Sequence, residues 1–192
     1  MGGKMKKKIL MVLVAALLAT GCVPLPSQTT TVVYEAQGPG AEKGSGGGCT
    51  GVAWSDYRFN LDDPGLPVPA WRTKPEEVRI SVLPKDDTLE VIFTGWSTRS
   101  RKSIDFDASD IRIRLDGKPR QPRNSSENRF TDFMWGSSLS LEIDIGTDLP
   151  ATVTLDAGRR AVVVDGKAFP LPGMTFRRAT RTTTMLTRPL NC

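Results

Sequence analysis

The chain has 192 residues, with 26 Lys and Arg against 21 Asp and Glu, a formal net charge of +5 and no histidine. The absence of histidine excludes Ser-His-Asp and Cys-His nucleophile activation, histidine general bases and the usual zinc ligand sets. An enzyme built on this chain would have to use a pair of carboxylates, as glycoside hydrolases do, or a lysine base. We expect no cofactor.

Residues 1–21 have the pattern of an export signal. Four lysines at positions 4, 6, 7 and 8 precede an unbroken apolar run from Ile9 to Ala19. A membrane-spanning helix needs about 20 apolar residues, so this shorter run suits the hydrophobic part of a signal peptide. Thr20 and Gly21 then place two small residues before Cys22.

The segment Leu18-Ala19-Thr20-Gly21-Cys22 resembles the lipobox of bacterial lipoproteins, in which the cysteine is acylated through its sulfur and becomes the new N-terminus. The resemblance covers residues 1–22 only and implies a lipid on Cys22 that attaches the chain to a membrane. Ala19 departs from the leucine that the family more often has there. Val23 implies the outer membrane, facing the periplasm, since an aspartate in that place often marks inner-membrane retention. An ordinary secretory signal, or a short buried helix, is the alternative.

Removal of the signal changes what the charge means. Four of the 26 basic residues are lost and no acidic ones, so 22 Lys and Arg face 21 Asp and Glu. This near-neutral balance argues against nucleic-acid binding. From residue 151 onward, seven basic residues, among them Arg177, Arg178 and Arg181, face only two aspartates. Such a stretch favours an anionic partner such as lipid headgroups; solvated strand faces that pair with acids elsewhere are the alternative.

The other two cysteines, Cys49 and Cys192, form an even pair in a chain expected to reside in an oxidising compartment. A disulfide between them would close nearly the whole domain and add up to roughly 5 kcal/mol in the chain-entropy model. Two free thiols are the alternative. We therefore predict a Cys49–Cys192 disulfide that joins the two ends of one domain.

Residues 22–48 are rich in Pro, Ser, Thr, Gln and Gly and end in Gly44-Ser45-Gly46-Gly47-Gly48. Because they show no periodicity and offer little to bury, we expect a flexible tether, with at most a brief strand at residues 32–34. Residues 49–192 are predicted to form the single folded domain.

From Cys49 onward apolar and polar residues alternate with a period of two, which predicts strands with one buried face. The alternating runs are 78–82, 89–93, 104–106, 111–115, 139–145, 153–155, 161–164 and 174–184. Asp116-Gly117 and Asp165-Gly166 lie between such runs and predict type I′ hairpin turns. About seven to nine short strands without a helical period predict an all-β fold, an antiparallel β-sandwich. We expect an immunoglobulin-like sandwich, with a small barrel as the alternative.

Acidic pairs such as Asp105 with Asp107 and Glu142 with Asp144 fall on the polar faces of predicted strands, where solvated carboxylates are expected. Nothing singles out either pair as catalytic. The segment from Asp105 to Asp116 partly imitates the spacing of a calcium loop. However, Asp110 stands where the sharp turn needs glycine, and strands rather than helices flank the segment. We therefore predict no metal site.

The four tryptophans are expected mainly in the core, because tryptophan is highly buried on average. Trp96 and Trp135 are the candidates for a surface anchor, since polar segments flank both. Arg99 and Arg101 follow Trp96 and would add hydrogen-bond donors. The candidate partner-binding residues are Trp96, Arg99, Arg101, Trp135, Arg177, Arg178 and Arg181.

These patterns favour a membrane-anchored, non-enzymatic domain of the bacterial envelope with a binding or scaffolding role. Its partner class stays open between an envelope protein, a glycan and an anionic lipid. The alternative is a small, glycan-directed envelope hydrolase that uses a carboxylate pair.

Overall fold

The computed structural model describes residues 26–45, 53–62, 76–131 and 135–186. The predicted export signal and all three cysteines, Cys22, Cys49 and Cys192, lie outside these ranges, so the lipid and the disulfide stay predictions. No helix in the described ranges has the length and apolar character needed to cross a membrane.

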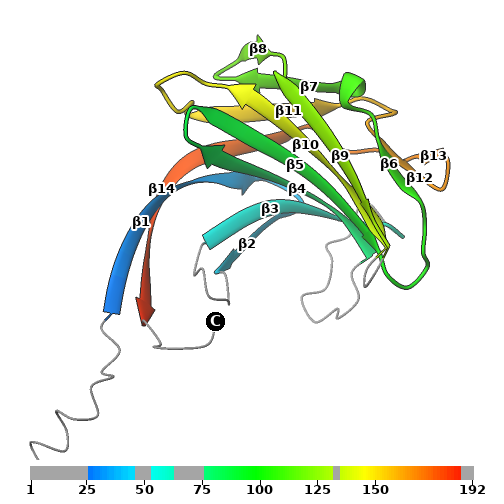
Figure 1. The fold of residues 1–192 in the computed structure, drawn as a ribbon, viewed down its shortest axis with the longest axis horizontal. Coiled ribbons are helices and arrows are strands. Elements are labelled where there is room, and N and C mark those ends of the chain that lie inside the picture. The colour runs from blue at the N-terminus through cyan, green and yellow to red at the C-terminus, as the bar shows by residue number, and fades with distance from the viewer. Residues whose placement is uncertain (1–25, 46–52, 63–75, 132–134, 187–192) are drawn as a thin grey trace, which may run out of the picture.

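The described residues form fourteen strands and one short 3-10 helix, and the strands make three sheets (Figure 1). Sheet A has the strand order β1 (Pro26–Gln37), β14 (Met174–Leu186), β11 (Thr152–Ala157), β7 (Ile111–Leu115) and β8 (Lys118–Arg120). Sheet B has the order β2 (Ala41–Ser45), β3 (Ala53–Asn60), β4 (Glu76–Lys85), β5 (Thr88–Ser97), β10 (Gly136–Asp144) and β9 (Asn124–Phe130). Sheet C has the order β13 (Lys167–Ala168), β12 (Val162–Val164) and β6 (Ile104–Phe106), and the 3-10 helix η1 (Ala108–Asp110) follows β6.

The core lies between the sheets and is built by alternation along their strands. Buried apolar side chains from sheets A, B and C belong to one hydrophobic cluster. Ile80 and Phe93 of sheet B and Leu155 and Phe176 of sheet A are fully buried within it. Each described strand pair is antiparallel, and every sheet is open with two edge strands. The all-β antiparallel sandwich is therefore confirmed, and the closed alternative is not adopted. The immunoglobulin-like arrangement stays a prediction.

Both predicted type I′ turns are confirmed by their backbone angles. Asp116 and Gly117 have φ angles of 49° and 77°, and Asp165 and Gly166 have φ angles of 48° and 73°. Type I′ turns need positive φ at both central residues, which glycine and aspartate adopt more readily than most residues do.

The prediction of a flexible tether over residues 22–48 is wrong for residues 26–45. Strand β1 pairs with β14 along its whole length, from Pro26 opposite Leu186 to Gln37 opposite Thr175. Tyr34 is 2% exposed and belongs to the core. The composition misleads here because Thr and Val are β-branched and favour strands as soon as a partner strand is available. That partner lies at the far end of the sequence.

The structure also contains strands that alternation does not predict. No residue of β8, β9 or β13 is buried, so their sequences carry no apolar period. A strand at the edge of a sheet is held by its backbone hydrogen bonds to one neighbour, and a period-two pattern of buried residues is then not required.

Tyr57 of β3 joins the two main sheets through a hydrogen bond to the backbone. Its hydroxyl accepts a hydrogen bond from the Thr175 N–H at 3.0 Å and donates one to the Gln37 carbonyl. The ring packs edge-on against Phe176 with centroids 5.1 Å apart. Tyr57 therefore connects sheet B to the end of β1 at Gln37 and the start of β14 at Thr175.

Candidate functional site

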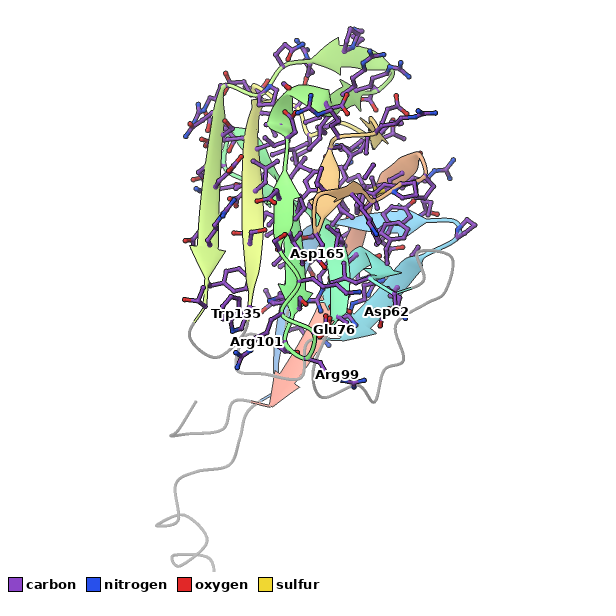
Figure 2. All side chains as sticks on the ribbon, turned by 90° about the vertical axis from the view of Figure 1, so that its right-hand side faces the viewer. Asp62, Glu76, Arg99, Arg101, Trp135 and Asp165 are labelled. Carbon is purple, nitrogen blue, oxygen red and sulfur yellow. The ribbon has the colours of Figure 1, made fainter. Side chains whose placement is uncertain are left out.

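Residues 98–103 form the connection between β5 and β6 and carry Arg99 and Arg101 at one end of the sandwich; we call this segment the arginine loop (Figure 2). Trp135 lies beside it, just before β10. The Arg101 guanidinium carbon is 5.4 Å from the Trp135 ring centroid, within the range of a cation–π contact. Trp135 is 39% exposed, and both arginines are exposed.

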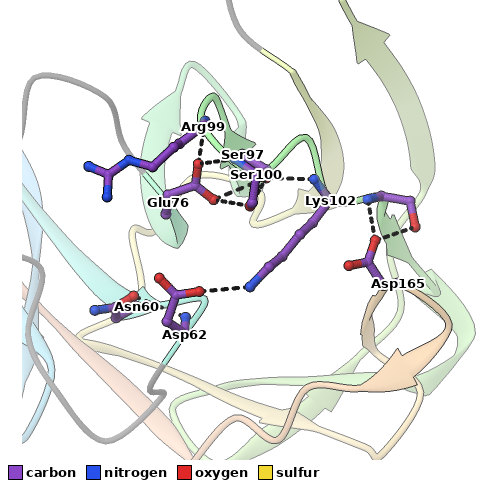
Figure 3. A network of polar contacts seen from close by, with 9 residues as sticks. Asn60, Asp62, Glu76, Ser97, Arg99, Ser100, Lys102 and Asp165 are labelled. Atoms are coloured by element: carbon purple, nitrogen blue, oxygen red, sulfur yellow. Dashed lines mark hydrogen bonds and ion pairs between the residues drawn. The ribbon is translucent and has the colours of Figure 1, made fainter.

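The carboxylate of Glu76 holds the arginine loop from beneath (Figure 3). It accepts hydrogen bonds from the Ser100 N–H at 3.0 Å, the Ser100 hydroxyl at 2.7 Å and the Ser97 hydroxyl at 3.0 Å. A fourth hydrogen bond comes from the Arg99 N–H. The residue is 2% exposed, so this carboxylate exchanges water for four protein donors.

Two opposing effects set the charge of Glu76. Desolvation by burial is the largest single influence and raises the pKa of the Glu76 carboxyl. The hydrogen bonds from Ser100, Arg99 and Ser97 together outweigh it and hold this pKa below its usual value. Glu76 is therefore a carboxylate at neutral pH, and it can keep accepting all four hydrogen bonds.

Further contacts fix the end of the arginine loop that leads to β6 (Figure 3). The Lys102 N–H donates to the Ser97 hydroxyl at 2.7 Å, and the Lys102 ammonium donates to the Asp62 carboxylate at 2.7 Å. The Ser103 N–H donates to the Asp165 carboxylate at 2.8 Å. Because these contacts already fix the loop backbone, binding through Arg99 and Arg101 would cost little further conformational entropy of that backbone.

Trp96 does not join the stack of Arg101 and Trp135. It lies half-buried on the face of sheet B opposite the core, where the Arg79 guanidinium carbon is 4.6 Å from its ring centroid. It contacts Arg79 and not the arginine loop, so the structure separates the two predicted anchor tryptophans.

The three β14 arginines lie in sheet A and take no part in the arginine loop. Arg181 donates to the Glu35 carboxylate at 2.7 Å, and Arg178 donates to the Leu149 carbonyl. Arg177 is exposed. Of the predicted partner-binding residues, the structure therefore brings together Arg99, Arg101 and Trp135, and it places the other four elsewhere.

A second buried carboxylate lies on β3, beside the strand that carries Glu76. Asp56 is 4% exposed, and the Arg79 Nε lies 3.6 Å from its carboxylate. Arg79 also binds Glu77, which is 1% exposed, at 2.9 Å. Desolvation by burial raises the pKa of Asp56 to about 6, and the nearby Arg79 and Arg58 lower it by less.

The sequence reasoning missed Glu76, Glu77 and Asp56, although one signal could have found the first. The Asp86-Asp87 pair connects β4 to β5, which end and begin at Lys85 and Thr88. A two-residue connection fixes the register of a hairpin, and this register places Glu76 opposite Ser97. An acid opposite a serine at the end of a hairpin is a candidate for holding the following loop.

The acidic pairs named from the sequence are engaged in contacts with basic side chains and with the backbone. Arg123 bridges Glu142 at 2.8 Å and Asp144 at 2.9 Å. Asp105 forms an ion pair with Arg129.

The acids of the calcium-like segment are likewise dispersed. The Asp107 carboxylate accepts from the Ser109 N–H at 3.0 Å and caps η1. Asp110 accepts from the Arg160 N–H at 2.6 Å, and Asp116 accepts from the Thr152 N–H at 2.8 Å. Within the described ranges, no three acidic or other metal-ligating side chains gather around one point.

Chemically, the arginine loop with Trp135 can bind an anionic group next to a ring or an apolar surface. A guanidinium offers a fork of donors to a carboxylate or a phosphate, and an indole face packs against sugar rings or apolar groups. Comparison of this chain with protein-family models, with curated proteins and with solved structures finds no match.

Proposed function

We propose that this protein is a non-enzymatic binding module of the bacterial envelope and that the arginine loop with Trp135 is its binding surface. The observation that carries the proposal is the exposed pair of Arg101 and Trp135 beside a loop fixed by the buried Glu76 carboxylate. Exposed aromatic and arginine side chains on a rigid support are typical of interaction hot spots. The partner class is an envelope protein, a glycan or an anionic lipid.

We further propose that Cys22 carries a lipid and that the protein is attached to the outer membrane, facing the periplasm. The lipobox resemblance supports this attachment. Because β1 begins at Pro26, four residues after Cys22, the domain would start within about 14 Å of the anchor. A domain so close to its anchor acts near the membrane surface.

Replacement of Cys22 by Ser tests the anchor. We expect an uncleaved precursor in the membrane fraction, because acylation precedes cleavage in the lipoprotein family. Normal cleavage of the Cys22→Ser variant with release into the soluble periplasm would contradict the lipid.

A binding role is preferred over glycan hydrolysis because the candidate carboxylate pairs are engaged elsewhere. Glu142 and Asp144 share Arg123, and Asp105 holds Arg129. A hydrolase needs one carboxyl as a proton donor and the other as a base or nucleophile across an open cleft. Asp56 has a raised pKa, but it is 4% exposed and adjoins Arg79.

Photo-crosslinking in intact cells tests the binding surface. A photoreactive residue at position 99 should capture a defined partner, and the additional change Trp135→Ala should remove most of that adduct. The matched control is the same photoreactive residue at position 177, which is exposed on the other sheet. The same adducts at both positions, or an adduct at position 99 that is insensitive to Trp135→Ala, would contradict the proposal.

A further inference from the structure

The start of β1 and the arginine loop lie on the same side of the molecule. In Figure 1, β1 and β14 leave the body together and reach downward on the left, and the arginine loop reaches downward on the right, between β5 and β6. Figure 2, turned about the vertical axis, again has Arg99, Arg101 and Trp135 at the lower end. Strands β7 and β8 stand at the top, on the opposite side of the domain.

If Cys22 carries a lipid, as proposed above, this shared side faces the membrane. Pro26 follows Cys22 by four residues, so the start of β1 lies within about 14 Å of the anchor. Two separate parts of the domain then point at the bilayer, namely the free ends of β1 and β14 and the arginine loop. The anchor holds only the first of these parts. A second contact through the arginine loop would therefore fix the orientation of the domain on the membrane.

The arginine loop carries positive charge that the described part of the chain does not neutralise. Its six residues include three basic side chains and no acidic one. Lys102 binds Asp62, whereas Arg99 and Arg101 are exposed and form no ion pair with an acid in the described ranges. Both guanidinium groups are therefore available to an anionic surface on this side of the domain.

Trp135 adds the second property that a membrane interface selects. Its ring is 39% exposed and lies 5.4 Å from the Arg101 guanidinium carbon. Tryptophan is enriched at the headgroup level of bilayers, because its ring is apolar and its N–H remains hydrated. Guanidinium groups match phosphate oxygens in pairs. An arginine beside an exposed indole thus suits the phosphate layer and the top of the acyl chains together.

We propose that the arginine loop with Trp135 binds the anionic phospholipid headgroups of the membrane that carries the anchor, an inference that rests on the proposed function and names its partner. Two arginines and one ring make a small contact, which would hold a freely diffusing protein or glycan weakly. Headgroups are different, because the lipid on Cys22 keeps them beside the loop. Binding is then intramolecular, and a small contact is enough.

Fluorescence quenching in vesicles tests this contact. The full-length protein, purified from membranes, is reconstituted into phosphatidylcholine vesicles whose acyl chains are brominated just below the headgroups. The difference between the wild type and Trp135→Phe isolates the emission of Trp135 from that of the other tryptophans. Quenching of this component should rise at least about twofold when phosphatidylglycerol makes up roughly a third of the lipid, because the anionic surface draws the arginines in.

Charge variants show whether the two arginines cause this rise. The double change Arg99→Gln and Arg101→Gln, measured against its own Trp135→Phe partner, should abolish the rise with phosphatidylglycerol. The matched control, Arg112→Gln with Arg120→Gln, removes the same charge from exposed positions on β7 and β8, on the opposite side of the domain. That control should keep the full rise. Quenching that ignores phosphatidylglycerol, or equal losses in both pairs of variants, would overturn the proposal.

The photoreactive residue at position 99 separates this proposal from the proposed function. In intact cells it should form an adduct with phospholipid, and Trp135→Ala should reduce that adduct. A protein or glycan adduct that depends on Trp135 would overturn the lipid assignment and leave the binding surface standing. The absence of any adduct that depends on Trp135 would contradict both.

Discussion

Glu76 and Asp56 lie in the same sheet, on β4 and β3, and they are 2% and 4% exposed, yet their pKa values move in opposite directions. The pKa of Glu76 is lowered, whereas that of Asp56 is raised to about 6. Desolvation by burial is the largest single influence on both and raises both. At Glu76 the hydrogen bonds from Ser100, Arg99 and Ser97 outweigh burial, whereas at Asp56 the nearby arginines do not.

Glu76 meets four directed donors from Ser97, Arg99 and Ser100, each within hydrogen-bonding distance. Asp56 lies 3.6 Å from the Arg79 Nε and is also near Arg58, and Arg79 forms a second ion pair with Glu77. A full charge that is poorly aimed and shared compensates less for lost hydration than several well-aimed N–H and O–H groups do. The number and aim of donors decide the charge of a buried carboxyl in this sheet.

The largest expected effect is that of Glu76→Gln, which keeps the shape but removes the charge. The amide cannot accept all four hydrogen bonds, so the free energy of unfolding should fall by about 3 kcal/mol. Urea denaturation at pH 7 measures the loss. The control Asp62→Asn breaks the exposed pair with Lys102 in the same network and should cost at most about 1 kcal/mol. Equal losses in both variants would show that Glu76 is no special anchor.

The raised pKa of Asp56 should make stability fall as the pH rises, the opposite of what the lowered pKa of Glu76 contributes. Its carboxyl binds a proton more tightly in the folded state, with a pKa of about 6 against 3.8, so its contribution to stability falls as the pH rises between these values. Two pKa units correspond to roughly 3 kcal/mol at the most. Asp56→Asn should remove this fall and be more stable than the wild type at pH 8. Parallel stability curves from pH 4 to pH 8 would contradict the raised pKa.

Ser97→Ala removes one donor to Glu76 and the acceptor of the Lys102 N–H. We expect a loss of about 1–2 kcal/mol and a higher pKa for the Glu76 carboxyl. A double-mutant cycle with Glu76→Gln is the measurement, because the serine should matter less once its charged acceptor is gone. Full additivity of the two changes would show that they act separately.

The smallest effect belongs to the exposed pair of Arg101 and Trp135. A cation–π contact at the surface contributes about 0.5–1 kcal/mol, so a double-mutant cycle with alanine at both positions should give a coupling energy of that size. If the arginine loop is held by Glu76, this coupling should nearly disappear in the Glu76→Gln background. Unchanged coupling there would mean that the loop keeps its shape without its anchor.

Sequence and structure agree best where one strand face is buried. The runs around Ile80, Phe93 and Leu155 alternate because they cover the core, and all three lie in strands. β9 has no buried residue to produce such a pattern, and β1 reaches the core only near its inner end. Strand β1 pairs with β14, which lies at the far end of the sequence, and the local composition of β1 cannot predict that pairing.

Some residues of the candidate site could likewise be predicted from the sequence, and others depend on the fold. Trp135 and Arg101 could be named from the sequence because exposed aromatic and basic residues in a polar segment are unusual on their own. Glu76 is harder to find, since its role follows only from the register of the β4–β5 hairpin, which places it opposite Ser97. Trp96 has the same polar flanks as Trp135, but its strand position turns it toward Arg79.

The long pairing of β1 with β14 has a mechanical consequence. If Cys22 is fixed in a membrane and the domain is held by a partner, tension enters the fold at Pro26 and runs along β1. The two strands are antiparallel and leave the body together, so β1 can yield only by sliding past β14 over all twelve of its residues. Their hydrogen bonds then bear the load together instead of opening one after another. The Tyr57 hydroxyl locks the inner end of this pair. If Cys22 is anchored, the first strand after it is therefore arranged to resist a pull along its own axis.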